Sequence, residues 1–96
     1  MKLSTALMFD GNVERLTSKI QDLEAAGVDM VLIPEIYGFD QISVLGYIAA
    51  RTREIELMTG IVNVYSRSPA LIAQSAATID ALSGGRFTLG IGTSGA

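Results

Sequence analysis

The sequence contains no cysteine and no histidine among its 96 residues. Disulfide bonds are therefore impossible, and so are metal sites built from thiolates or imidazoles. A Ser–His or Cys–His nucleophile pair and a histidine base are excluded for the same reason. Only an all-carboxylate metal site stays open, and we expect no metal.

Charged residues are also scarce, at 18% of the chain, and the net charge is −3. Lysine and arginine are scattered without a basic stripe, so we expect no nucleic-acid partner. No apolar run approaches the roughly 20 residues of a membrane span. The opening segment "MKLSTALMFDG" is too short in its apolar part for a signal peptide, because Asp10 interrupts it. We interpret it as the first strand of a cytoplasmic protein.

Hydrophobic residues, by contrast, make up 49% of the chain, which is high for so small a domain. Strands covered on both faces would explain this excess. The run Met30–Ile33, closed by Pro34, has the continuous apolar character of such a strand. Three further strands are predicted near residue 3, at Ile55–Ile61 and at Phe87–Ile91.

Helical spacing of apolar residues appears three times between these strands. Asn12, Asp40 and Ser68 are placed as N-caps, and Pro69 stands at the first helical position after Ser68. Gly27 and the pair Gly84–Gly85 mark helix ends. The predicted apolar stripes are Val13, Leu16, Ile20 and Leu23; Ile42, Leu45, Ile48 and Ala49; and Ile72, Ala76, Ile79 and Leu82.

The predicted order is therefore βαβαβαβ, with a strand every 25 to 30 residues or so, as repeated βαβ units require. Both a doubly wound sheet and part of a (β/α) barrel fit this order. In either architecture, ligands bind beyond the carboxyl ends of the strands. That rule selects four segments: Phe9–Asn12, Pro34–Asp40, Thr59–Ser68 and Gly92–Ala96.

The closing loop "GIGTSG" has the composition of a ligand-binding loop. Its glycines allow close backbone approach, and Thr93 and Ser94 can donate hydrogen bonds. A flexible loop without function is the alternative. Gly90, Gly92 and Gly95 match GxGxxG, but no helix or ribose-binding acid follows, so this is not a dinucleotide fingerprint.

Three carboxylates, Asp10, Glu35 and Asp40, fall on the selected face. Asp10 belongs more naturally to a turn and Asp40 to a helix cap, which leaves Glu35 as the stronger candidate for function. Gly60 lies inside a predicted strand, where it indicates either close approach of a ligand or steric relief in a crowded barrel.

Other polar residues follow the same strand or the last helix. Asn63 is a candidate ligand donor, whereas Arg67 is expected to be solvated. Asp80 and Arg86 are expected to form a structural ion pair on the opposite side of the molecule.

The segment "RSPALIAQSAATIDALSGGRFTLGIGTSG" resembles the bacterial luciferase-like flavin and deazaflavin oxidoreductases. It combines a Pro-capped helix, Asp-x-Leu-Ser-x-Gly-Arg and a strand ending in Gly-x-Gly, and the upstream segments "AAGVDMVLIPE" and "IELMTGIVNVYSRSP" extend the similarity over nearly the whole chain. The resemblance implies a (β/α) barrel that binds an F-420-type deazaflavin or FMN and transfers a hydride to or from a small organic substrate.

The resemblance also implies a site and a domain. A cis peptide that backs the flavin ring in part of the family would correspond to Gly60–Ile61. Ile36 stands where some members have a catalytic histidine, so the catalytic residues stay unknown. Residues 1–96 would be the N-terminal half of the barrel, truncated after strand four. The alternative is an inactive half-barrel whose unpaired edges only allow self-association into homo-oligomers. The implied coenzyme-binding residues are Glu35, Gly60, Ile61, Asn63, Gly92, Thr93, Ser94 and Gly95.

Overall fold

The three helices begin at the predicted capping residues in a computed structural model that describes residues 2–34 and 39–93. The side chains of Asn12, Asp40 and Ser68 each accept hydrogen bonds from backbone N–H groups of the first helical turn. Gly27, Gly84 and Gly85 take positive φ values where the first and third helices end. The helices are α1 (Val13–Ala25), α2 (Gln41–Arg51) and α3 (Pro69–Leu82).

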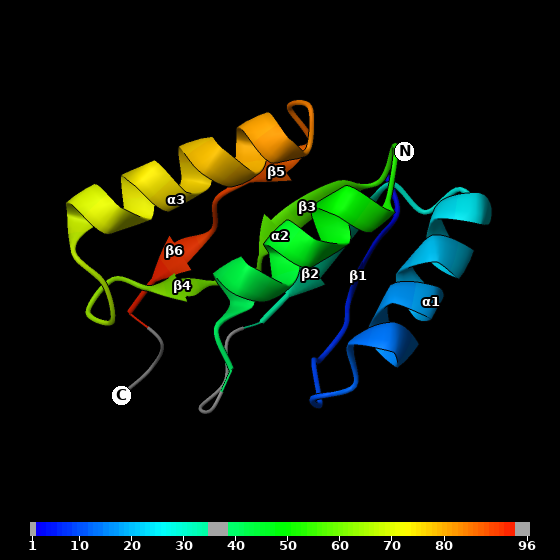
Figure 1. Cartoon of the computed structure of the whole chain (residues 1–96), viewed down its shortest axis with the longest axis horizontal. Helices are drawn as coiled ribbons and strands as arrows, with labels where there is room; N and C mark the ends of the chain where they lie inside the picture. The colour runs from blue at the N-terminus through cyan, green and yellow to red at the C-terminus, as the bar shows by residue number, and fades with distance from the viewer. Residues whose placement is uncertain (1, 35–38, 94–96) are drawn as a thin grey trace.

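The described strands form two parallel sheets (Figure 1). The four-stranded sheet has the order β1-β2-β3-β5, and a two-stranded sheet pairs β4 with β6. The strands are β1 (Ser4–Ala6), β2 (Met30–Ile33), β3 (Glu56–Thr59), β4 (Val62–Asn63), β5 (Phe87–Thr88) and β6 (Ile91–Gly92). The predicted α/β class with four parallel strands in one sheet and three helices is confirmed.

Two predicted strands differ in the structure. The strand predicted at Ile55–Ile61 ends at Thr59, and a separate strand begins at Val62. The strand predicted at Phe87–Ile91 is interrupted at residues 89 and 90. At this point the Thr59 hydroxyl donates to the Gly90 carbonyl and accepts from the Gly90 N–H, both at 2.7 Å. A side chain thus replaces the backbone pairing, so β4 and β6 diverge from the main sheet as a separate pair.

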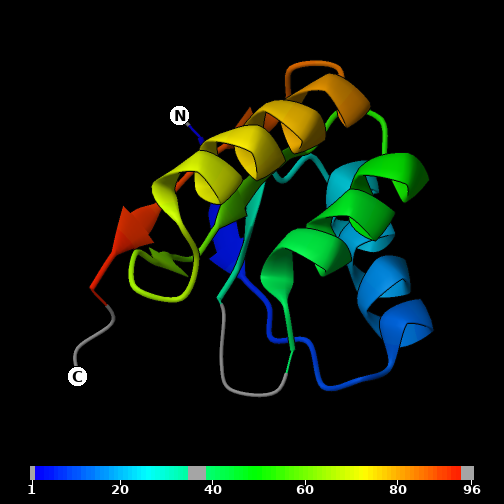
Figure 2. The same ribbon diagram turned by 60° about the vertical axis from the view of Figure 1, so that its left-hand side comes forward.

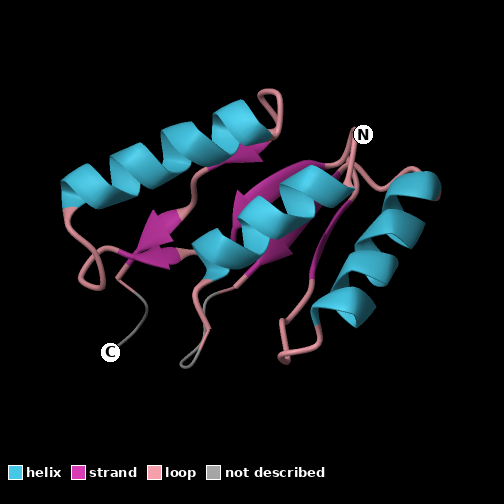
Figure 3. Cartoon of the chain, in the orientation of Figure 1, coloured by secondary structure: helices cyan, strands magenta, loops and turns pink. Residues whose placement is uncertain are grey.

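All three helices lie on one face of the main sheet, as Figures 2 and 3 show. Val31 and Ile33 of β2 are buried against them, whereas Met30 and Leu32 on the other face are half-buried. Coverage on both faces was therefore predicted wrongly for the described part of the chain. Helices on one face are the arrangement of a (β/α) barrel, whereas a doubly wound sheet carries helices on both faces.

The core lies between this sheet and the helices. It joins Leu16 and Ile20 of α1, Leu45 and Ile48 of α2, and Ile79 of α3 to the buried side chains of β2 and β3. Leu82 was predicted to lie in the α3 stripe but is 63% exposed. Among the described residues, α3 packs against α2 and β5, and Leu82 lines the open groove between α3 and α2 rather than the core. None of the described helices is both long enough and apolar enough to cross a membrane.

The predicted ion pair between Asp80 and Arg86 does not form, although the structure describes both residues. Arg86 instead donates five hydrogen bonds, four of them to backbone carbonyls of Ala49, Thr52, Ile55 and Ser83. The guanidinium therefore ties the end of α2 to the start of β5. It lies at the amino-terminal edge of the sheet, and its structural role was predicted correctly with the wrong partner.

Candidate functional site

The carboxyl ends of the described strands lie along one edge of the molecule, where the helices also begin (Figure 1). Gly60 donates its N–H to the carbonyl of Ile33 at 2.9 Å, which joins the segment after β3 to the end of β2. Asn63 of β4 lies opposite Gly92 of β6 in the parallel register. Segments from three parts of the chain therefore meet at this edge.

Two glycines of the predicted site are in close contact with their neighbours. A Cβ on Gly60 would lie 2.8 Å from Cα of Pro34, and a Cβ on Gly92 would lie 2.5 Å from Cδ1 of Ile61. Real Cβ atoms do not approach so closely, so both positions require glycine or a local shift. Gly60, Ile61, Asn63 and Gly92 are thus neighbours in space, and the exposed Thr93 follows directly. Glu35, Ser94 and Gly95 lie outside the described residues.

Gln41, the first residue of α2, is only 2% exposed and faces this segment. Its side-chain Nε2 donates to the Ile61 carbonyl at 2.8 Å, and its Oε1 accepts from the Gly60 N–H at 3.3 Å. One buried amide therefore contacts both ends of the Gly60–Ile61 unit. A predicted cis peptide bond between these two residues is wrong, because every described peptide bond is trans.

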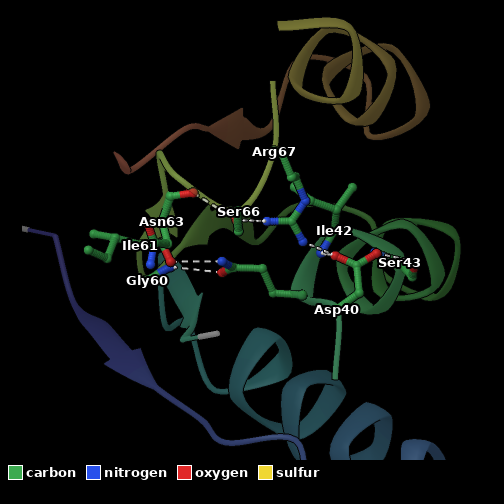
Figure 4. A network of polar contacts seen from close by, with 9 residues as sticks. Asp40, Ile42, Ser43, Gly60, Ile61, Asn63, Ser66 and Arg67 are labelled. Atoms are coloured by element: carbon green, nitrogen blue, oxygen red, sulfur yellow. Dashed lines mark hydrogen bonds and ion pairs between the residues drawn. The ribbon is translucent and has the colours of Figure 1, made fainter. Parts of the chain in front are cut away.

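A chain of polar contacts runs from Asn63 to the N-terminus of α2 (Figure 4). The Ser66 hydroxyl donates to the Asn63 carbonyl at 2.7 Å and accepts from Nη1 of Arg67 at 3.2 Å. Arg67 then forms an ion pair with Asp40. The Arg67 side chain is only 14% exposed, so its predicted solvation is wrong.

Asp40 is held in its charged form. Its partial burial by itself would raise the pKa of the carboxyl, but hydrogen bonds from Ser43 and Arg67 outweigh burial and lower that pKa. Asp40 also accepts from the Ile42 and Ser43 backbone N–H groups, which confirms its predicted role as a helix cap.

Asp10 behaves as the predicted turn residue. Its Oδ1 accepts from the Asn12 N–H at 3.0 Å, and its Oδ2 pairs with Arg15 at 2.7 Å. The Asn12 N–H contributes most to lowering the pKa of this exposed carboxyl. Within residues 2–34 and 39–93, no three carboxylates gather closely enough to hold a metal ion.

Asn63 shapes the loop that follows it. Its Oδ1 accepts from the Tyr65 N–H at 2.9 Å, and its carbonyl accepts from the Ser66 N–H at 3.0 Å. Within the described part of the chain, its Nδ2 donates to no other group. This nitrogen, like the hydroxyl of the exposed Thr93, is therefore free to donate to a ligand within the described part of the predicted site.

The sequence reasoning missed Gln41, and it misjudged Arg67. The signal for Gln41 was its spacing, because Val44, Leu45 and Ile48 follow it at three, four and seven residues, all on the buried face of α2. A polar residue at such a position must find a hydrogen-bond partner. The described edge thus offers glycine backbone, buried amides and paired charges, a set suited to binding and orienting a flat ligand rather than to moving protons.

Comparison with known proteins identifies a family that this chain matches. Residues 2–96 match the family model described as luciferase-like monooxygenase. The chain is 37% identical over 93 residues to the 5,10-methylenetetrahydromethanopterin reductase of Archaeoglobus fulgidus, which covers 96% of this chain and 28% of that protein. It is 38% identical over 68 residues to the 4-hydroxyprotoasukamycin monooxygenase of Streptomyces nodosus subsp. asukaensis, covering 71% of this chain and 16% of that protein.

Solved structures agree on the fold. The coenzyme F420-dependent tetrahydromethanopterin reductase of Methanopyrus kandleri superposes with a TM-score of 0.88 at 31% identity, covering 94% of this chain and 26% of that one. An FMN complex of a type II Baeyer-Villiger monooxygenase from Pseudomonas putida gives a TM-score of 0.83 at 18% identity, over 98% of this chain and 30% of that one, a likeness in fold alone.

The chain spans less than a third of each of these proteins. Its strands and helices superpose on part of the barrels of the two solved structures. The family model nevertheless matches almost every residue, from the first strand to the last. This chain belongs to the luciferase-like monooxygenase family.

Proposed function

We propose that this chain forms part of the coenzyme site of an oxidoreductase that transfers a hydride between an F-420-type deazaflavin or FMN and a small organic substrate. The observation that carries the proposal is the meeting of Gly60–Asn63 with Gly92 at the carboxyl edge of a parallel sheet. Relatives with both coenzyme types share this fold. When bound, the coenzyme supplies the hydride chemistry, and the protein supplies binding and orientation.

Each residue would contact the coenzyme according to its own chemistry. Gly60 and Ile61 offer a peptide plane without a bulky side chain at the glycine, which suits contact with a flat ring system. The free Nδ2 of Asn63 can donate a hydrogen bond to a ring carbonyl. Gly92 and the following residues through Gly95, with the hydroxyls of Thr93 and Ser94, would close the site from the β6 side. Glu35 stays a proposed member by its position after β2.

The glycines of the proposed site hold its segments close together. At Gly60 and Gly92 an added Cβ would overlap Pro34 and Ile61, so a side chain at either position would displace residues around the proposed site. Arg67 and Arg15, the arginines on this edge, are both paired with aspartates, so we assign neither to a coenzyme phosphate. We assign no catalytic acid or base to the described residues.

The second candidate is self-association of a half-barrel without activity. It is favoured by the face of the main sheet opposite the helices, where Met30, Leu32 and Met58 are only half-buried. In a complete barrel this face would be covered by the remaining strands. We accordingly propose residues 1–96 as the N-terminal half of a barrel domain, and self-association as the behaviour of that half when nothing covers the face.

Titration of the 96-residue chain with FMN and with the deazaflavin coenzyme, followed by fluorescence, tests the first proposal. Saturable micromolar binding of one of them is expected. Gly92→Leu should weaken it because the new side chain enters the space beside Ile61, whereas Gly46→Leu on α2, where nothing lies within 4 Å of an added Cβ, should not. Absence of binding by a folded chain that elutes as large oligomers would favour the second candidate instead.

A further inference from the structure

Gln41 is the buried polar side chain that links α2 to the proposed coenzyme site. It is the largest polar residue among the fully buried side chains of the described core. Burying an amide is unfavourable by about 1–3 kcal/mol unless its groups find partners. A polar side chain at the first position of a helix can form its hydrogen bonds with solvent. The Gln41 amide instead forms hydrogen bonds with the backbone of Gly60 and Ile61.

The two bonds hold the peptide units on either side of the Gly60–Ile61 peptide, because the Gly60 N–H belongs to the unit before it and the Ile61 carbonyl to the unit after it. The Gly60 N–H has a second acceptor in the Ile33 carbonyl at 2.9 Å, so β2 contributes to its position. Within the described structure, the Ile61 carbonyl accepts its hydrogen bond from Nε2 of Gln41 at 2.8 Å. Glycine has no Cβ to restrict its φ and ψ, so without this bond the peptide following Gly60 could rotate.

The same end of α2 is tied to the chain beyond Asn63. Arg67 pairs with Asp40, the residue directly before Gln41, and contacts Ser66, which bonds the Asn63 carbonyl. Residues 60–61 and 66–67 are therefore both attached to the N-terminus of α2 (Figure 4). The segment between them is the one that carries the free Nδ2 of Asn63.

From this arrangement we infer that Gln41 is a positioning residue, whose side-chain amide holds the peptide units on both sides of the Gly60–Ile61 peptide and thereby orients that peptide against the ring of the bound coenzyme. This inference rests on the proposed function. Gln41 acts through the backbone of the next strand and does not itself touch the coenzyme.

The test compares Gln41→Met with the matched variant Gln21→Met in the 96-residue chain. Gln21 also donates its amide to a backbone carbonyl, that of Arg51 at 2.9 Å, but at the opposite end of α2. Gln41→Glu serves as a second variant, since it keeps an acceptor for the Gly60 N–H and removes the donor to Ile61. Circular dichroism melting establishes that each variant is folded before binding is measured.

Three readouts are expected to move only in the Gln41 variants. The ¹³C chemical shift of the Ile61 carbonyl, measured without coenzyme, should change in Gln41→Met because this carbonyl loses the bond from Nε2, and it should stay unchanged in Gln21→Met. Affinity for FMN or the deazaflavin coenzyme should fall about tenfold, the effect of roughly one lost hydrogen bond. The visible absorbance band of the bound flavin should also shift, which a loss of stability alone would not cause.

The outcomes separate this inference from the proposed function. If the wild type binds a coenzyme and a folded Gln41→Met binds it equally well with the same absorbance band, the positioning role is refuted while the site stands. An unchanged chemical shift of the Ile61 carbonyl in Gln41→Met refutes it as well. If the wild type binds neither coenzyme, the proposed function fails first and the positioning role fails with it.

Discussion

Glycine at Gly90 is required by a neighbour rather than by its own backbone conformation. A Cβ there would lie 2.5 Å from the carbonyl oxygen of Thr59 and 3.0 Å from Cε of Met58. The first contact is with backbone, which cannot move without disturbing β3. Gly46, in the middle of α2, has nothing within 4 Å of its own hypothetical Cβ.

Gly90→Ala should therefore destabilise the chain by about 1–3 kcal/mol, as overpacking does in a close-packed interior. Gly46→Ala, the matched control, should stabilise it by up to about 1 kcal/mol because alanine is the better helix former. Urea unfolding of both variants measures the difference. An unchanged midpoint for Gly90→Ala would mean that Thr59 and Gly90 are not in close contact.

Glu24 at the end of α1 holds the loop before β3. Its Oε2 accepts from the backbone N–H groups of Arg53, Glu54 and Ile55, at 2.8, 2.6 and 2.9 Å. Burial alone would raise the pKa of this carboxyl, but the three amide bonds outweigh it and lower the pKa. A lowered pKa in the folded state means that the charged form stabilises folding.

Glu24→Gln should consequently reduce the free energy of unfolding at pH 7 by about 1–2 kcal/mol. The stabilisation by Glu24 is present above the ordinary glutamate pKa of about 4.3 and is lost as the pH falls through the lower, folded value. The gap in melting temperature between wild type and variant should narrow over that range. Glu54→Gln is the control, because the exposed Glu54 side chain has no hydrogen-bond partner among the described residues. A constant gap from pH 7 to pH 3 would contradict the assignment.

At the scale of elements, Thr59 explains why two strands divide at the same level. Its hydroxyl bonds both polar groups of the buried Gly90 backbone, so β3 and the β5–β6 joint are linked by a side chain. The link allows β4 and β6 to leave the main sheet without leaving buried groups unpaired.

Thr59→Val keeps the shape of the side chain and removes both hydrogen bonds. We expect a loss of about 1–3 kcal/mol in the free energy of unfolding, because the Gly90 N–H would be buried without a partner, whereas the Gly90 carbonyl keeps its bond from the Val62 N–H at 2.8 Å. Thr59→Ser should retain most of the stability. Thr78→Val removes an exposed hydroxyl contact to the Gln74 carbonyl within α3 and should change stability by less than about 0.5 kcal/mol. Equal effects of the two valine substitutions would contradict the role of Thr59.

Helix limits and the run Met30–Ile33 could be predicted because capping residues and apolar spacing are local signals. The early end of the strand predicted at Ile55–Ile61 could not be predicted, because it depends on the contact of Thr59 with Gly90, 31 residues further along the chain. In the sequence alone, Gly60 and Gly90 indicate only that the predicted strands are weakened at these positions. The partner of Arg86 was missed for a related reason, since carbonyls at a helix end carry no signature in the sequence.

For the whole molecule, the main consequence is a sheet with two unlike faces. Val31 and Leu57 lie under the helices, whereas Leu32 and Met58, adjacent in register, lie on the other face and are half-buried. A separate apolar groove of about 340 Å³ lies between α2 and α3 and includes Leu71 and Leu82. Either surface could drive association of copies.

Leu32→Asn distinguishes these two surfaces. If copies associate through the sheet, sedimentation velocity should show Leu32→Asn shifted toward the monomer and Leu82→Asn unchanged, because burial of apolar surface drives association. The reverse pattern would assign the contact to the groove between α2 and α3. Sequence spacing predicted Leu82 as core, so this exposed surface became apparent only in the structure.

The position of the candidate site could be predicted from the rule that ligands bind beyond the carboxyl ends of parallel strands. Its residues Gly60, Ile61, Asn63 and Gly92 do lie together. Their supports, Gln41 and the Asp40–Arg67 pair, depend on contacts between elements and were not predicted. The site therefore combines residues visible in the sequence with positioning groups visible only in the fold.

The most direct test of the coenzyme site is the set of backbone amide signals in a two-dimensional ¹⁵N–¹H NMR titration with FMN and with the deazaflavin coenzyme. We predict that the signals of Gly60, Ile61, Asn63 and Gly92 shift together and saturate, while those of Gly27 and Gly84 at the opposite edge stay in place. Shifts confined to the opposite edge, or no shifts with either coenzyme, would contradict the account.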